Sequence, residues 1–275
     1  MRTRSRWRLY LVPSLVAVSH LTSGYLHLSV TPPAADPVAE LPQDQALVLR
    51  YHPLGSTIAR YGMRMSGVTT TRVDAKPTRS TIVTEMDLSQ KCESISSDVL
   101  RLTTTIDCGD IDPGYAPNSL HMRSGPVLST MTNRGQILET SGFQGLDLRS
   151  MQLVLPAQPV STGYAWEEPI PSSPNIPVPL LVRYSIASIR RFRNDVIVCI
   201  AASVRTNGAP ALDGLSLAVR SDGKIWFSAT RGQMLRNDVI SAMHMRLRRV
   251  VSGGPQIIYT DMKMTMSMWT IPEVK

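Results

Sequence analysis

The stretch Met262–Trp269 reads MKMTMSMW, and its methionines alternate with other side chains at a period of two. Successive side chains of a β-strand point to opposite faces, so this alternation is typical of a strand with one apolar face. The same pattern recurs in Met243–Arg248 and in Arg60–Ser66. Half-buried strands of this kind occur in antiparallel sheets that pack one face against a core. The sequence therefore predicts a mainly β protein.

Length and charge narrow the class of protein. The chain has 275 residues, of which 43% are hydrophobic and 18% charged, which suffices for a sizeable core and excludes an intrinsically disordered chain. The formal net charge is +8, but four of the positive charges are arginines within the first eight residues, and the others are interspersed with acids. A nucleic-acid-binding protein gathers Lys and Arg on one face and adds stacking aromatics. We therefore expect no nucleic acid as a partner.

An uncharged segment, Leu9–Val30, follows the N-terminal arginines. As a helix it would be roughly 33 Å long, enough to cross a bilayer core of about 30 Å. Because positive charge stays on the cytoplasmic side, we predict a single-pass inner-membrane anchor with the bulk of the chain in the periplasm. A cleaved signal peptide is the alternative. The predicted membrane-interface residues are Arg2, Arg4, Arg6, Trp7, Arg8, Tyr10 and Tyr25.

Four residues of this segment, His20, Ser23, Gly24 and His27, would share one face of the helix, because they are three, four and seven positions apart. Small and polar residues on one face of a membrane helix favour packing against another helix. Ionisable residues there usually face protein or water, since contact with lipid is unfavourable. We therefore predict that this face contacts other membrane-protein subunits.

Composition divides the chain into five parts. Residues 1–30 form the Arg-rich tail and anchor, and residues 31–44 form a proline-rich extended linker. Two β halves, residues 45–155 and 180–275, flank a crossover at residues 156–179. We expect the seven prolines of this crossover to prevent both strand pairing and helix formation.

The two β halves share a short repeat. Arg134–Leu138 reads RGQIL, and Arg231–Leu235 reads RGQML. Each repeat follows one predicted strand and precedes another, and its glycine supplies the positive φ that a turn between strands requires. The predicted fold is thus a set of curved antiparallel sheets in two similar halves, preceded by one N-terminal transmembrane helix.

Several short motifs resemble those of exported bacterial β-clam proteins, which include lipoprotein carriers and secreted relatives. The residues that carry the resemblance are Leu155-Pro156, Pro159-Val160, Gly163, Trp166, Trp226-Phe227, Gly232–Leu235 and the closing methionine strand. The resemblance covers residues 45–272 and implies a curved antiparallel sheet, built twice over, with an apolar concave face. In the carriers that face holds lipid acyl chains, but this chain lacks their lipidation cysteine.

The cysteines and the absence of known catalytic motifs indicate which chemistry the protein can carry out. An exported domain meets an oxidising compartment, which predicts a disulfide between Cys92 and Cys108. Cys199 lies in an apolar stretch, so we expect a buried thiol. The sequence has no nucleophile elbow, zinc-protease helix motif, P-loop or dinucleotide-binding glycine motif. We therefore expect no catalytic residues, no metal site and no enzyme activity.

The methionines are the more informative residues. Eight of the fourteen lie in alternating strand patterns: Met63, Met65, Met243, Met245, Met262, Met264, Met266 and Met268. Thioether side chains are flexible and adapt to irregular partners. Two interpretations stay open: a closed core packed against a second layer, or an apolar cradle for a lipid, a pigment tail or another protein.

These features favour a non-enzymatic accessory subunit of a larger bacterial membrane complex, respiratory or photosynthetic. Its helix would pack on partner subunits, and its β domain would cover the periplasmic face of the assembly. Its partners would be other membrane-protein subunits and the lipid bilayer. It would need no cofactor, beyond contact with the lipid or pigment of a partner. If the N-terminal segment is cleaved, the alternative is a soluble periplasmic binder or carrier of lipid or another hydrophobic ligand.

Overall fold

The computed structural model of the protein describes residues 39–40, 46–55, 57–73, 76–112, 120–121, 126–141, 152–172, 177–208, 214–251 and 254–272. Within these ranges the regular elements are β-strands, which confirms the mainly β prediction. In chain order the strands are β1 (Ala39–Glu40), β2 (Ile58–Val73), β3 (Lys76–Ser94), β4 (Val99–Asp112), β5 (Leu120–His121), β6 (Val127–Thr132), β7 (Ile137–Ser141), β8 (Ala165–Ile170), β9 (Leu180–Phe192), β10 (Asp195–Thr206), β11 (Leu215–Ser228), β12 (Gln233–Val251) and β13 (Gly254–Ile271).

The N-terminal predictions fall outside these ranges. The anchor segment, its interface residues and the face formed by His20, Ser23, Gly24 and His27 belong to residues 1–30, which the structure does not describe. Across the described ranges, no helix has the length and hydropathy needed to cross a bilayer.

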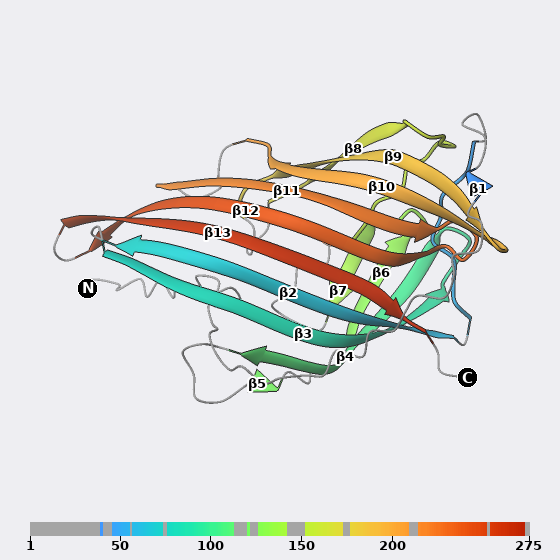
Figure 1. Cartoon of the computed structure of the whole chain (residues 1–275), viewed down its shortest axis with the longest axis horizontal. Coiled ribbons are helices and arrows are strands. Elements are labelled where there is room, and N and C mark those ends of the chain that lie inside the picture. The colour runs from blue at the N-terminus through green and yellow to red at the C-terminus, as the bar shows by residue number, and fades with distance from the viewer. Residues whose placement is uncertain are drawn as a thin grey trace, which may run out of the picture.

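All strands join one antiparallel sheet of 13 strands (Figure 1). The strand order is β1-β9-β10-β11-β12-β13-β2-β3-β4-β6-β7, with β5 paired to β4 and β8 paired to β9. Neighbours in sequence are therefore neighbours in space along β2–β4 and along β9–β13. The two runs meet where β13 pairs with β2, from Ile258 opposite Val73 to Ile271 opposite Arg60. The two β halves thus share a single sheet.

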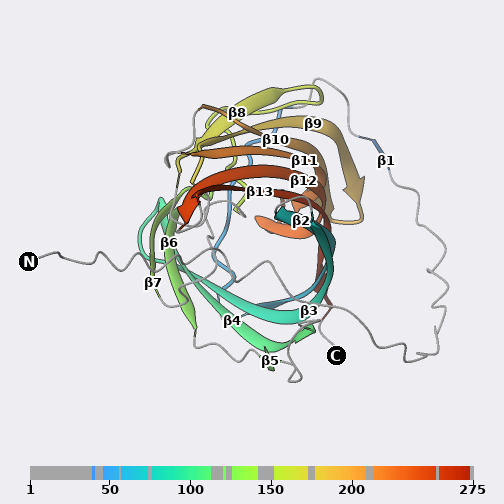
Figure 2. The same ribbon diagram turned by 90° about the vertical axis from the view of Figure 1, so that its left-hand side faces the viewer.

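The sheet is strongly curved, and Figure 2 shows it curling around an interior. Period-two alternation assigns the side chains to the two faces. On β13, buried Met262 belongs to the concave face and exposed Lys263 to the convex face. The convex face carries charged pairs such as Arg64–Glu85 at 3.2 Å. Because both side chains of this pair are well exposed, it contributes little to stability.

An irregular segment, residues 46–55, crosses one end of the curved sheet and is named the strap here. Backbone hydrogen bonds attach it to four separate places. Leu47 and Val160 bond each other twice, at 2.8 Å. Tyr51 N donates to Asn133 O at 2.7 Å, His52 N to Gly232 O at 3.2 Å, and Leu54 N to Cys92 O at 3.0 Å. The strap thereby closes this end of the sheet, to the right in Figure 1.

The two RGQ repeats are the turns that press against the strap. One repeat joins β6 to β7 and the other joins β11 to β12. Gly135 and Gly232 both have positive φ, at 92° and 63°. A Cβ on Gly135 would clash with the carbonyl oxygen of Leu153, and a Cβ on Gly232 would lie 2.5 Å from the backbone nitrogen of His52. Glycine is therefore required twice over, for the turn and for the close approach.

The core fills the closed end of the sheet. Its fully buried side chains come from the strap, the crossover and the sheet, and they include Leu49, Leu155, Val160, Ile200 and Phe227. The ring of Tyr51 meets that of Phe227 edge to face, with centroids 5.3 Å apart. The strap and the crossover thus supply the second layer that a single sheet lacks.

The prediction of a crossover without strand pairing is wrong. Residues Ala165–Ile170 form β8, which pairs with β9 from Ala165 opposite Ser185 to Ile170 opposite Leu180. Within the described ranges β8 pairs with β9 alone, so it is an edge strand. Proline lacks an N–H to donate, but on an edge strand that donor need not find a partner. Pro169 is therefore compatible with pairing at this position.

We predict that Gly232→Ala lowers the free energy of unfolding by about 1–3 kcal/mol more than Gly163→Ala does. Both glycines have positive φ, so both variants carry the strain of a left-handed alanine. A Cβ at position 163 meets no atom within 4 Å, whereas at position 232 it collides with the strap, and overpacking adds about 1–3 kcal/mol. Urea denaturation measures both losses. Equal losses would show that the strap does not press on the turn.

Candidate functional site

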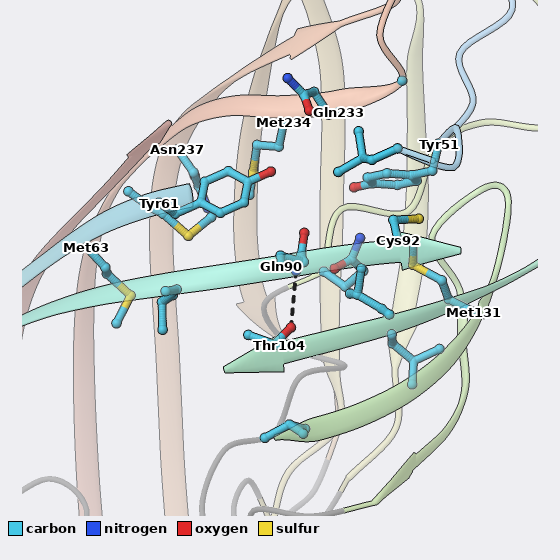
Figure 3. Close-up of a pocket in the computed structure, with 18 of the residues that line it drawn as sticks. Tyr51, Tyr61, Met63, Gln90, Cys92, Thr104, Met131, Gln233, Met234 and Asn237 are labelled. Atoms are coloured by element: carbon cyan, nitrogen blue, oxygen red, sulfur yellow. Dashed lines mark hydrogen bonds between the residues drawn. The ribbon is translucent and has the colours of Figure 1, made fainter. Parts of the chain in front are cut away.

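A partly enclosed cavity of about 130 Å³ lies on the concave face beside the closed end (Figure 3). Its wall is formed by the strap and by β2, β3, β4, β6, β7, β12 and β13. Cavities of about this size accept a benzene-sized group. Six methionines contribute to the wall: Met63, Met86, Met131, Met234, Met266 and Met268.

Strand register brings the central methionines together. Met268 on β13 lies opposite Met63 on β2, and Met63 lies opposite Met86 on β3. On its other side Met268 pairs with Asn237 of β12. Directly opposed side chains in a sheet are about 5 Å apart at Cβ. The register therefore produces a row of three methionines that ends on an asparagine.

The predicted cradle is divided between the cavity and the sheet beyond it. Met63, Met266 and Met268 line the cavity. The others continue away from the closed end: Met65 pairs with Met266, and Met243 with Met262. Met264 and Met245 follow the same period on β13 and β12.

Three cavity methionines were not predicted: Met86, Met131 and Met234. The sequence does contain signals for two of them. Met86 alternates with Leu88 and Gln90, which also line the cavity. Met234 occupies the fourth position of its RGQ repeat, and the equivalent residue of the other repeat, Ile137, lines the cavity too.

The polar groups of the described wall are amides, hydroxyls, a thiol and the exposed imidazole of His52. No Asp, Glu, Lys or Arg is among the described residues that line the cavity. Gln90 donates from Nε2 to the Thr104 hydroxyl at 3.3 Å. The Tyr51 hydroxyl donates to the carbonyl oxygen of Leu153 at 3.1 Å. Asn237 is only 7% exposed, yet its Oδ1 atom has no hydrogen-bond partner.

Burial keeps two ionisable groups of the wall, Tyr61 and Cys92, neutral. Removal from water raises the pKa of Tyr61 to about 12, and the neighbouring Cys92 adds to the rise. The same desolvation raises the pKa of Cys92 to about 11, because burial disfavours the charged form. A thiol with this pKa is protonated at neutral pH and is a poor nucleophile. The arrangement therefore suits the binding of uncharged, apolar groups.

The predicted disulfide between Cys92 and Cys108 is contradicted by the structure. Cys92 is a buried free cysteine. Its register partner is Leu102, whereas Cys108 lies opposite Asp87. Five residues on β3 separate these two positions, which is roughly 16 Å along the strand, far beyond the Cα separation that a disulfide allows. Cys199 is also free, and it is half-buried instead of fully buried.

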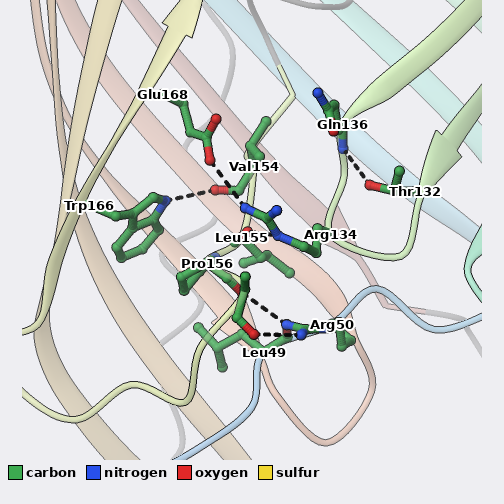
Figure 4. A network of polar contacts seen from close by, with 11 residues as sticks. Leu49, Arg50, Thr132, Arg134, Gln136, Val154, Leu155, Pro156, Trp166 and Glu168 are labelled. Carbon is green, nitrogen blue, oxygen red and sulfur yellow. Dashed lines mark hydrogen bonds and ion pairs between the residues drawn. The ribbon is translucent and has the colours of Figure 1, made fainter.

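Two arginines donate hydrogen bonds to residues 155–157, the segment in which the crossover begins (Figure 4). Arg134 donates from Nε to Leu155 O at 2.7 Å and forms an ion pair with Glu168 at 3.2 Å. Arg50 donates to the carbonyl oxygens of Pro156 and Ala157, at 2.9 and 2.8 Å. Hydrogen bonds with a charged donor are stronger than neutral ones, so these contacts hold the start of the crossover in place.

Trp166 completes this attachment. Its indole nitrogen donates to Val154 O at 2.9 Å, and its ring stacks on Tyr184 with centroids 5.0 Å apart. The same short segment carries Gln152, which lines the cavity and is hydrogen-bonded to Tyr51. The motif residues of the crossover thus support one wall of the site.

Metal binding finds no support in the described part of the chain, where no three His, Cys, Asp or Glu residues cluster in a way that could hold an ion.

Comparison with known proteins gives no family. No protein-family model matches the sequence, and no curated protein does. Among solved structures, the fold is similar to the outer membrane protein OprG from Pseudomonas aeruginosa, with 6% sequence identity over 82% of this chain and 100% of that chain. The TM-score is 0.15, at which the likeness supports no conclusion. The resemblance to β-clam proteins stays a prediction.

We predict that Cys92 makes the protein less stable at alkaline pH. The folded protein holds the thiol proton up to a pKa of about 11, against 9.0 for an ordinary cysteine. The stabilisation is therefore complete below pH 9 and is lost as the pH rises to 11, a loss of about 2–3 kcal/mol. Urea denaturation in reducing buffer from pH 8 to 11 measures it. Cys92→Ala should remove this loss and leave only the part that the buried tyrosines add above pH 10, because their pKa values are raised as well.

The matched control is Cys199→Ala. It leaves the Cys92 thiol in place. Desolvation also raises the pKa of the half-buried Cys199, so this variant should lose a smaller part of the pH dependence than Cys92→Ala does. A Cys92→Ala variant that loses stability as steeply as the unchanged protein would contradict the assignment.

Proposed function

We propose that the protein binds a long apolar ligand of the lipid type in the concave cavity. The observation that carries this proposal is a methionine-rich wall beside a densely packed core, with no Asp, Glu, Lys or Arg among its described residues. Such walls occur in sites for hydrophobic ligands, where a few polar groups fix the orientation. Methionine suits the role because its flexible thioether adapts to chains of varied shape.

The size of the cavity supports insertion of one end of the ligand. A volume of about 130 Å³ holds a benzene-sized group, so the rest of a longer molecule would lie outside it. The concave face continues from the cavity through Met65, Met264 and Met262, which follow Met266 along the same pair of strands. Contact with this face would remove further apolar surface from water, at about 25 cal/mol per Å².

The predicted membrane anchor would add to this function. If residues 1–30 remain in the inner membrane, they would hold the site at the periplasmic surface, next to a source of lipid. A role as an accessory subunit depends on the same residues and on partners that bind them. Both predictions therefore await a test on the N-terminal segment itself, such as the N-terminal mass of the native protein.

Filling the cavity should weaken binding. We predict that Met266→Trp weakens the binding of a long-chain alkyl diazirine about tenfold, equivalent to about 1.4 kcal/mol, because the indole occupies the space of the ligand. The full-length protein, held in an amphipathic polymer, is photolabelled across a range of probe concentrations. Mass spectrometry then quantifies the labelled peptides of β2, β3 and β13.

The matched control is Ile240→Trp, which places the same side chain on the convex face, where Ile240 is 68% exposed. Labelling of the three strands should be unchanged in this variant. Equal labelling of both variants, or labelling spread evenly over the chain, would contradict binding in the cavity. Thermal unfolding of each variant shows whether the sheet remains folded.

A further inference from the structure

We propose that the ligand carries an uncharged hydroxyl group, which enters the cavity and donates a hydrogen bond to Oδ1 of Asn237. This inference rests on the proposed function and names the chemical class of the ligand: a long-chain alcohol, in preference to a fatty acid or an ether. Tyr61, on the same face of the sheet, supplies the second polar contact.

Asn237 has the features of a ligand-binding group. It lines the cavity, is only 7% exposed and leaves Oδ1 without a partner. Buried polar atoms of native proteins are nearly always hydrogen-bonded, and a buried acceptor left unpaired costs about 1–3 kcal/mol. A carbonyl oxygen can only accept, so the missing partner must be a donor. A hydroxyl group of the ligand meets that requirement.

Tyr61 and Asn237 bracket the same space. Asn237 pairs with Met268, and Met268 pairs with Met63, which is two residues from Tyr61 on β2. Both side chains therefore belong to the concave face, and β13 alone separates their strands. Two strand spacings amount to about 10 Å, and both residues line the cavity. Figure 3 shows both residues at the wall of the cavity.

The side chains of Tyr61 and Asn237 suit different atoms of a ligand hydroxyl group. The Tyr61 phenol is protonated at neutral pH, since burial raises its pKa to about 12. It can therefore donate to the oxygen of the ligand hydroxyl, whose hydrogen is directed at Asn237. One hydroxyl group would thus satisfy both side chains.

A charged head group does not fit this site. No Asp, Glu, Lys or Arg is among the described residues of the wall, and His52, the histidine among them, is exposed. A buried ion without a partner is strongly disfavoured. A carboxylate would also place a second acceptor against Oδ1 of Asn237, where only a donor is satisfied. An ether oxygen has no hydrogen to donate and would leave Oδ1 unpaired. The site should therefore separate ligands by head group even when their chains are identical.

Competition between three ligands of one chain length tests the inference. The full-length protein is photolabelled with the alkyl diazirine in the presence of 1-dodecanol, methyl dodecyl ether or dodecanoate. We expect 1-dodecanol to compete about 3- to 10-fold more effectively than the ether, the range given by one net hydrogen bond. Dodecanoate should be the weakest competitor. Asn237→Leu should abolish the preference for the alcohol while ether competition is kept.

For each variant we measure the ether concentration and the alcohol concentration that reduce labelling by half, and we compare their ratio between variants. Partition of the competitors into the polymer is the same for every variant, so it cancels in this comparison. Asn207→Leu is the matched control, because Asn207 is exposed and lies outside the cavity wall; its ratio should equal that of the unchanged protein. If Asn237→Leu does not fold, Tyr61→Phe provides the second variant, and its ratio should fall toward one. Two results would overturn the inference: the ether competes better than the alcohol, or the ratio of ether to alcohol concentrations is the same in both variants as in the unchanged protein.

The two levels of the proposal fail in different ways. If no probe labels the strands of the cavity, the proposed function itself is wrong. If labelling is specific but all three competitors are equivalent, the cavity binds apolar chains and the hydroxyl inference alone is wrong.

Discussion

A single curved sheet can keep its concave face dry only if an end of the curve is closed. In this protein the strap performs that closure, and it does so through the backbone. Four of its residues are hydrogen-bonded to four separate places: the crossover, the β6–β7 turn, the β11–β12 turn and the end of β3. Satisfying these peptide groups allows an irregular segment to lie against the core, because unpaired backbone groups there would be strongly destabilising. The core and the cavity both depend on this closure.

The side chains change character along the concave face. Close to the strap the core is made of Leu, Val, Ile and Phe residues that are fully buried. The wall of the cavity, which the strap also lines, is rich in methionine and has one unsatisfied asparagine oxygen. Aliphatic side chains pack to high density and fix a unique arrangement, whereas methionines tolerate varied neighbours. The same sheet is thus rigid where it must hold its shape and adaptable where a ligand would lie.

The sequence predicted the local features of this fold well. Period-two alternation identified the methionine strands β2, β12 and β13, and the RGQ repeats marked two turns between strands. Period two also placed Met266 and Met268 on one face of their strand, and Met63 and Met65 on one face of theirs, because alternation within a strand requires no knowledge of which strands pair.

What depends on distant pairing was not predicted. The sheet is continuous because β13 pairs with β2, and their paired residues are almost 200 positions apart. The disulfide prediction failed for a local reason: the spacing of cysteines along the chain does not reveal the register of β3 and β4, in which Cys92 and Cys108 differ by five residues. The strap has no periodic pattern and was included in the first β half. Its role is visible only once the two turns that it contacts are seen at one end of the sheet.

Closure and cavity are linked through the repeated turns. In each RGQ repeat the glycine lies against the strap or the residues beside it, and the residue two positions later lines the cavity. Ile137 and Met234 are thus held by the same turns that admit the strap. Since a turn is a short, stiff unit, a shift of the strap at Gly135 or Gly232 must move these two wall residues as well. The shape of the cavity is therefore tied to the position of the strap, and a ligand that reshapes the wall would act on the closed end of the sheet.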